Sequence, residues 1–112
     1  MSIHHDQELL KHILEETSFL LHHTGNLTKD EFLTDEVLCR ATIRSLEVIG
    51  EATKKLTDAF KTRHDVIEWK KIAGTRDKLI HDYCGIDYEI VWDILASRIQ
   101  QQHNYILEIQ KA

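Results

Sequence analysis

Hydrophobic residues recur at helical spacing along most of the chain, separated by short polar stretches. Apolar side chains three and four positions apart mark one face of a helix. Proline is absent and glycine occurs only four times, so few sharp turns are expected. The pattern predicts four main helices, over residues 9–21, 35–60, 68–83 and 87–109. Short connections between them favour an all-α, up-and-down helical bundle.

The polar stretches contain residues that are typical of helix ends. Gly25 and Asn26 follow the first run, and Gly85 follows the third. Asp87 is a good N-cap residue for the fourth helix. A short turn is expected around residues 28–32 (TKDEF), ahead of the second helix.

Length and composition place the chain in the class of small globular proteins. Its 112 residues are enough for one domain, expected to span residues 1–112, with a core of its own. No apolar run approaches the roughly 20 residues needed to cross a bilayer, and no signal-peptide pattern precedes the first helix. Cys39 and Cys84 form neither a disulfide framework nor a metal-ligand spacing. We therefore expect a cytoplasmic protein that is not embedded in a membrane.

One side chain on the third predicted helix is out of place. On an ideal helical wheel Arg76 lies about 40° from Ile72, in the middle of an apolar stripe. An arginine is seldom buried without a partner, so the fold must supply an anion, a wet cleft or an interface there. His81 lies about 140° from Arg76 on the same wheel. The two side chains can meet only if the helix end unwinds or if a second subunit brings its own copy.

The residues around this arginine resemble a known family. Arg76, four residues, His81, one residue and Tyr83, followed by GIDYEIVWDIL, resemble the signature of the HEPN superfamily. More specifically, they resemble the HepT-like toxins, which are encoded beside a minimal nucleotidyltransferase antitoxin of the MntA type. The segments RSLEVIGEA and IEWKKIAGTRDKLIHDY extend the likeness over roughly residues 35–100. One departure is Glu68, where many relatives have a proline.

The resemblance implies the toxin of a type VII-like toxin–antitoxin system. Such a protein is a metal-independent RNA endonuclease that needs no cofactor and works as a homodimer. Arg76 and His81 of both subunits would form one composite catalytic cleft. Tyr83 would be the acceptor of AMP groups from the nucleotidyltransferase antitoxin, which would silence the toxin.

The distribution of charge bears on RNA as a substrate. A formal net charge of −5 would repel a polyanion. However, residues 54–78 contain eight basic and four acidic side chains, and this basic segment leads into the motif. The predicted RNA-contacting residues are Arg63, Lys70, Lys71 and Lys78.

Several alternatives stay open at this point. A non-catalytic HEPN module would only hold a nucleotidyltransferase partner, a nucleotide or both. In a purely structural reading, Arg76 would pair with a carboxylate, His81 would cap the helix end and Tyr83 would fill the core. His4, His5 and His12 with Asp6 match no standard zinc spacing, so no metal site is predicted.

Overall fold

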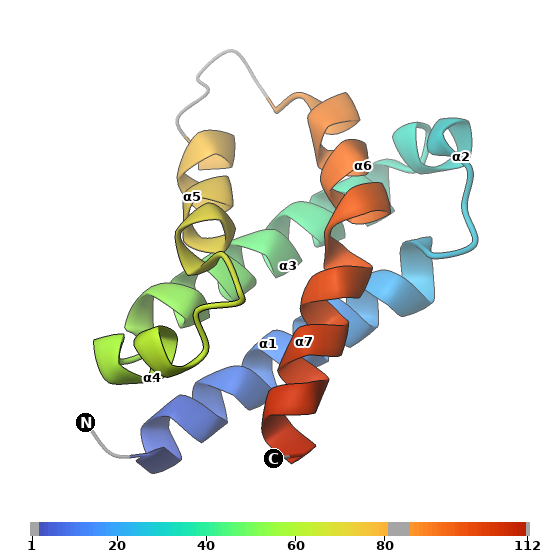
Figure 1. The fold of residues 1–112 in the computed structure, drawn as a ribbon. Helices are drawn as coiled ribbons and strands as arrows, with labels where there is room; N and C mark the ends of the chain where they lie inside the picture. Colours follow the sequence, from blue (N-terminus) through green and yellow to red (C-terminus); the bar gives the residue numbers. More distant parts are fainter. Residues whose placement is uncertain (1–2, 81–85, 112) are drawn as a thin grey trace.

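The predicted all-α class is confirmed. The computed structural model describes residues 3–80 and 86–111, with side chains described for residues 5–74 and 86–111. Within these ranges helices are joined by short connections (Figure 1). The helices are α1 (Ile3–Thr24), α2 (Lys29–Leu33), α3 (Glu36–Lys55), α4 (Asp58–Arg63), α5 (Trp69–Ile80), α6 (Tyr88–Ser97) and α7 (Ile99–Lys111).

Two long helices form the base of the bundle. α1 and α3 lie side by side and run in opposite directions, as Figure 1 shows. α5 and the α6–α7 pair cross this base, with α5 packed on α3 and α7 packed on α1. α2 contacts both α3 and α6. α5 and α7 therefore pack on neighbouring helices of the same base, α5 on α3 and α7 on α1.

The core lies where these helices meet, and the predicted hydrophobic stripes supply it. Leu10, Ile13 and Leu20 of α1 are buried, as are Leu46 and Ile49 of α3. Burying each such side chain contributes about 1.5–3 kcal/mol. The apolar positions read from the sequence therefore face the core.

The second predicted helix ends earlier than its apolar spacing suggested. α3 ends at Lys55, because Leu56 has an extended conformation, with φ −61° and ψ 143°. Thr57 then caps α4 by accepting a hydrogen bond from the Phe60 backbone N–H at 3.2 Å. The prediction of one helix over 35–60 is wrong in this part, although Leu56 and Phe60 are both buried.

The fourth predicted helix is interrupted at one residue. Arg98 has φ −123° and ψ −34°, and it separates α6 from α7. Its backbone N–H still donates to the Ile94 carbonyl oxygen at 3.0 Å. Leu95 and Ile99 are buried on either side of Arg98. The hydrophobic stripe is therefore continuous across the interruption.

The expected turn around residues 28–32 is a short helix with a complete capping box. The Thr28 hydroxyl accepts from the Glu31 N–H at 3.2 Å, and the Glu31 carboxylate accepts from the Thr28 N–H at 2.9 Å. These hydrogen bonds to Thr28 lower the pKa of Glu31 below its usual value. α2 buries Phe32, whose ring centroid lies 5.5 Å from that of Trp92.

Cys39 is buried, and we expect it to resist alkylation in the folded protein. Its thiol donates to the Phe32 carbonyl oxygen at 3.3 Å. Burial, and to a smaller degree the negative charge of Asp35, raise the pKa of the Cys39 thiol, which disfavours the reactive thiolate. In a Cys84→Ser variant, iodoacetamide should modify Cys39 only after denaturant is added, as measured by intact mass. Rapid modification without denaturant would contradict the buried position.

No helix among the described residues is both long and apolar enough to cross a membrane.

Candidate functional site

The first half of α5 is held firmly against the core. Trp69 is 7 % exposed, and Ile72, one turn later, is also buried. The Trp69 indole N–H donates to the His64 carbonyl oxygen at 3.1 Å. The ring of Phe60 packs against both Trp69 and His64, with centroids 5.9 Å and 4.6 Å away. These contacts tie the start of α5 to α4 and set the direction of the helix.

α4 is in turn fixed to the first turns of α1 by a buried carboxylate. Asp6 is 4 % exposed and accepts two hydrogen bonds from Thr57, from the backbone N–H at 2.9 Å and from the hydroxyl at 2.7 Å. The Thr57 hydroxyl thereby donates to Asp6 and accepts from Phe60. Sequence reasoning treated Asp6 only as a weak metal-ligand candidate and missed this role.

Replacing Asp6 with alanine should destabilise the fold. The change removes both hydrogen bonds from Thr57 and leaves the Thr57 N–H and hydroxyl without this acceptor, at a cost of about 1–2 kcal/mol for each donor. We expect a loss of about 2–4 kcal/mol in the free energy of unfolding, measured by urea denaturation followed by circular dichroism. Glu8→Ala, on an exposed position of the same helix, should change it by less than about 0.5 kcal/mol. Equal effects of the two substitutions would contradict the assigned role of Asp6.

Only the first residue of the motif falls within α5. Residue 76 belongs to this helix, four positions after Ile72, which is about 6 Å along the helix axis. The side chains of Arg76 and Lys78 are outside the described residues, as are His81 and Tyr83 entirely. The expected end of the third helix at residue 83 also falls there. The prediction that Arg76 and His81 meet in one cleft therefore stays a prediction.

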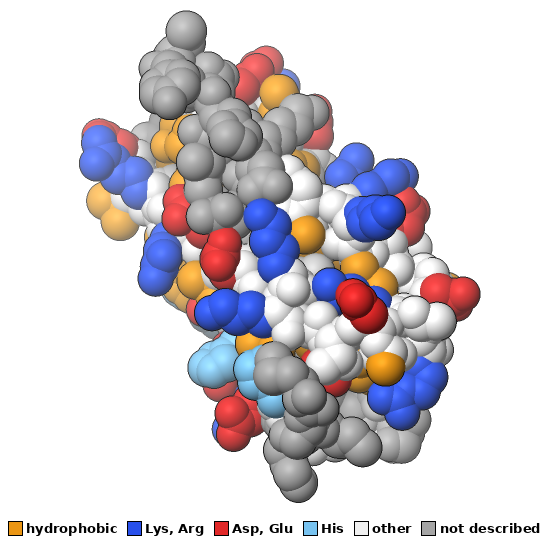
Figure 2. Space-filling model, turned by 90° about the vertical axis from the view of Figure 1, so that its left-hand side faces the viewer, with side chains coloured by type: hydrophobic (Ala, Val, Ile, Leu, Met, Phe, Trp, Pro, Cys, Tyr) orange, Lys and Arg blue, Asp and Glu red, His pale blue; other side chains and the backbone are white. Residues whose placement is uncertain are grey.

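The other predicted RNA-contacting residues are exposed. Arg63 lies at the end of α4, and Lys70 and Lys71 lie in the first turn of α5. The Lys71 ammonium group forms an ion pair with the Glu68 carboxylate at 2.7 Å. Figure 2, which shows the side on which α4 and α5 lie in Figure 1, has lysine and arginine side chains in several separate places with acidic ones between them. On this face the described cations are dispersed among acidic groups.

A cavity of about 290 Å³ lies between the start of α5 and α7. Buried Ile67 and Ile72 line it, together with exposed Val66. Its polar lining comes from both sides of the cavity and consists of Glu68, Lys71, Arg98, Gln101, Gln102 and Tyr105. Sequence reasoning did not single out the four of these residues that lie on or beside α7.

The charges at this cavity are not balanced. The hydrogen bond and the positive charge of Lys71, with a smaller contribution from Arg98, lower the pKa of Glu68 below its usual range. Glu68 is therefore ionised at neutral pH and offsets one of the two cations. The charged side chains that line the cavity, Glu68, Lys71 and Arg98, therefore carry a net positive charge, which favours an anionic ligand.

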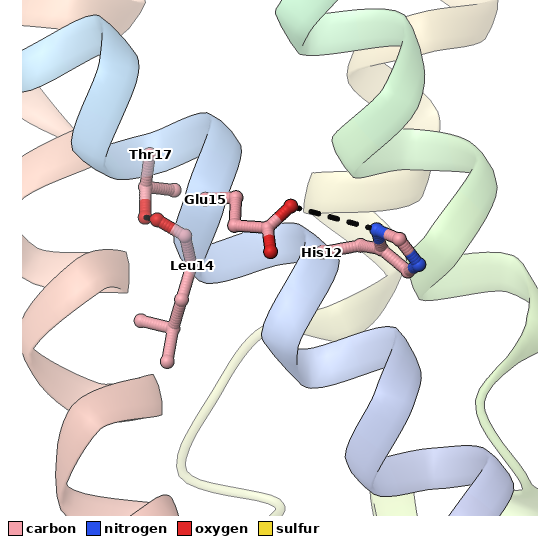
Figure 3. A network of polar contacts seen from close by, with 4 residues as sticks. All are labelled: His12, Leu14, Glu15 and Thr17. Carbon is pink, nitrogen blue, oxygen red and sulfur yellow. Dashed lines mark hydrogen bonds and ion pairs between the residues drawn. The ribbon is translucent and has the colours of Figure 1, made fainter.

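His12, one of the histidines considered as metal ligands, has another contact. His12 Nδ1 lies 3.8 Å from the Glu15 carboxylate on the exposed side of α1 (Figure 3). Thr17, which points from the other side of α1 in Figure 3, is 2.7 Å from Nδ1 of His103. Among the described residues, no group of three or more His, Cys, Asp and Glu side chains is placed to hold a metal ion.

Comparison with known proteins places the chain in a family. Residues 13–109 match the family described as "Ribonuclease HepT-like". The protein named "Putative RNase TTE0752" from Caldanaerobacter subterraneus subsp. tengcongensis is 44 % identical over 100 residues, covering 89 % of each chain. "Putative RNase MJ0127" from Methanocaldococcus jannaschii is 46 % identical, covering 88 % of this chain and 82 % of its own length.

A third relative carries the family name itself. The "Probable ribonuclease HepT" of Thermococcus cleftensis is 38 % identical over 93 residues, covering 83 % of this chain and 84 % of its own length. No solved structure matches the chain. The matched region contains the whole Arg76-to-Tyr83 motif and extends beyond the residues that carried the resemblance. The chain belongs to the ribonuclease HepT-like family of the HEPN superfamily.

Proposed function

We propose that this protein is a metal-independent RNA endonuclease, acting in the cytoplasm as the toxin of a toxin–antitoxin pair. The observation that carries the proposal is the family match over residues 13–109, which includes the Arg76, His81 and Tyr83 motif. The anchored start of α5 supports it, because a catalytic residue needs a rigid element beneath it. Trp69 and Ile72 supply that rigidity one to two turns before Arg76.

The proposed reaction is an internal transesterification of RNA. A neutral histidine takes the proton from a ribose 2′-hydroxyl, and the 2′-oxygen attacks the neighbouring phosphorus. The bond from phosphorus to the 5′-oxygen breaks, and a protonated histidine gives its proton to that leaving oxygen. The products are a 2′,3′-cyclic phosphate and a free 5′-hydroxyl. Arg76 stabilises the extra negative charge on the phosphorane in the transition state.

A homodimer accounts for the need for two histidines. The motif has one histidine in each chain, whereas the reaction uses one as base and one as acid. A two-fold axis beside the end of α5 would bring His81 of each subunit to one cleft, with both copies of Arg76. The same arrangement removes the difficulty that the two residues point about 140° apart within one helix.

Tyr83 is the proposed control point. An antitoxin of the minimal nucleotidyltransferase class would transfer AMP from ATP to the Tyr83 hydroxyl, with pyrophosphate as leaving group. Tyr83 lies about 20° from Arg76 on the helical wheel, two turns along. The attached phosphate would place negative charge near Arg76 and oppose the binding of an RNA phosphate.

Cleavage of RNA in the presence of EDTA tests the proposal. The purified wild-type protein should cut structured RNA and tRNA with EDTA present and leave 2′,3′-cyclic phosphate ends, as read by end mapping. His81→Ala and Arg76→Ala should each lose at least about a hundredfold in rate. His22→Ala, which replaces an exposed histidine on α1, is the matched control and should retain the wild-type rate.

The intact mass of the protein decides what an inactive sample means. Inactivity in an unmodified, folded wild-type dimer would overturn the nuclease proposal and favour a non-catalytic module that binds a nucleotidyltransferase partner. Mass added in steps of one AMP would instead identify the silenced form and support the role of Tyr83. Expression in cells gives a parallel test, because a toxin should slow growth and His81→Ala should not.

A further inference from the structure

We infer that the cavity between α5 and α7 is a subsite for one nucleotide of the RNA strand, next to the bond that is cut. The inference rests on the proposed function and adds to it a second place where the substrate is held. The cavity has a volume of about 290 Å³. This is close to the lower end of typical small-ligand pockets, roughly 300–1,000 Å³, so the cavity suits one nucleotide unit.

The walls of the cavity match the parts of a nucleotide. Ile67 and Ile72 form an apolar surface on which a base can lie. Tyr105 of α7 lines the opposite side, and its hydroxyl accepts a hydrogen bond from the Gln101 amide nitrogen at 3.5 Å. Aromatic side chains and apolar surfaces hold bases by stacking, and this contact tolerates any base.

Gln101 and Gln102 add the capacity to distinguish bases. Their amides each present a donor and an acceptor, which is the pattern that pairs with base edges. Gln101 is exposed and Gln102 is partly buried, so both amides are at the cavity and not in the core. A preference for particular nucleotides at one position of the substrate would come from these two side chains.

Arg98 is the phosphate-binding group in this arrangement. It lies at the interruption between α6 and α7, is exposed, and lines the cavity. Lys71 forms the close ion pair with Glu68 at 2.7 Å, whereas Arg98 acts on Glu68 only through a smaller effect of its charge. The Arg98 guanidinium is therefore the better placed of the two cations to bind a further anion. A planar guanidinium group can bind two oxygens of one phosphate.

The position of the cavity relative to Arg76 supports the same substrate. Ile72 lines the cavity, and residue 76 follows it on α5 by about 6 Å along the axis. The two positions lie about 40° apart around the helix, so they share one face. A strand with its scissile phosphate at Arg76 can therefore place an adjacent nucleotide in the cavity.

Substitution of Arg98 in two protein backgrounds tests the subsite. In the active enzyme, Arg98→Gln should raise KM for a short RNA about tenfold, with kcat and the product ends unchanged. In a His81→Ala background, Arg98→Gln should weaken RNA binding about tenfold, measured by fluorescence anisotropy, and reduce the salt dependence by about one phosphate contact. Arg40→Gln, an exposed arginine of α3 that pairs with Glu36, is the matched control and should change neither quantity.

The proposed recognition of the base at the cavity is tested by cleavage preference and by crosslinking. Gln102→Ala should flatten the cleavage preference among RNAs that differ only in the nucleotide next to the cut. An RNA with one 4-thiouridine at that position should crosslink to the peptide that contains Tyr105 upon irradiation.

The outcomes separate the subsite from the proposed function. If wild type cleaves RNA and Arg98→Gln matches Arg40→Gln in KM and binding, the subsite is refuted and the nuclease stands. If wild type does not cleave but RNA binding depends on Arg98, the subsite stands without the nuclease. If free AMP binds in an Arg98-dependent way while RNA binding ignores Arg98, the cavity is a mononucleotide site and the RNA subsite is refuted.

Discussion

Dimers that combine one wild-type subunit with one His81→Ala subunit are expected to cleave RNA at least about a hundredfold more slowly than wild-type dimers. In the proposed composite cleft each histidine would have a different task, so the loss of either would remove the base or the acid. General acid–base catalysis of this kind contributes roughly 10²–10⁴-fold to the rate. The single-turnover rate of mixed dimers, purified through two different tags and checked by mass, measures the effect.

If each subunit instead had a complete active site of its own, the same experiment would give a different result. Each wild-type subunit would then work alone, and a mixed dimer would retain about half of the wild-type rate. A mixed dimer with His22→Ala in one subunit controls for the tags and for purification. Full activity in a monomeric variant would contradict the shared cleft outright.

The positions of the long helices could be predicted from the sequence because each has a one-sided hydrophobic face. Leu10 and Ile13 of α1 and Leu46 and Ile49 of α3 are all buried, as their spacing predicts. This signal is local, since it depends only on which face of a helix is apolar. The capping box of α2 was also present in the sequence, as Thr28 followed three positions later by Glu31.

The break after α3 depends on a contact that local spacing does not contain. Leu56 and Phe60 continue the apolar pattern of α3, yet Leu56 is extended and a new helix follows. Thr57 at this break is bound by Asp6, 51 positions earlier in the chain. The apolar spacing indicates buried residues both before and after the end of α3, so it cannot show where α3 ends.

The two parts of the candidate site differ in the same way. Arg76 stood out in the sequence because a charged side chain interrupts an apolar stripe within one helix. The cavity is assembled from the start of α5 and from α7, and Arg98 and Gln102 look like ordinary polar surface residues when each helix is considered alone. Their polar groups come together only because α5 packs on α3 and α7 packs on α1.

Trp69→Ala is expected to cost about 3–5 kcal/mol in the free energy of unfolding, the largest effect on stability that we predict. The indole is 7 % exposed, packs against Phe60 and donates a hydrogen bond to the His64 carbonyl oxygen. Its removal leaves a cavity where α4 and α5 join. Since small domains are stable by only about 5–15 kcal/mol, urea denaturation should show a large shift of the midpoint.

Two further substitutions separate packing from hydrogen bonding at this point. Trp69→Phe keeps an aromatic ring beside Phe60 but loses the indole donor, so it should cost about 1–3 kcal/mol. Val66→Ala, at a neighbouring residue that is 63 % exposed, should cost less than about 0.5 kcal/mol. If Trp69→Ala were no worse than Val66→Ala, α5 would not be anchored at its start. The direction in which α5 presents residue 76 would then need another explanation, because Trp69 and Ile72 are the buried side chains of its first turns.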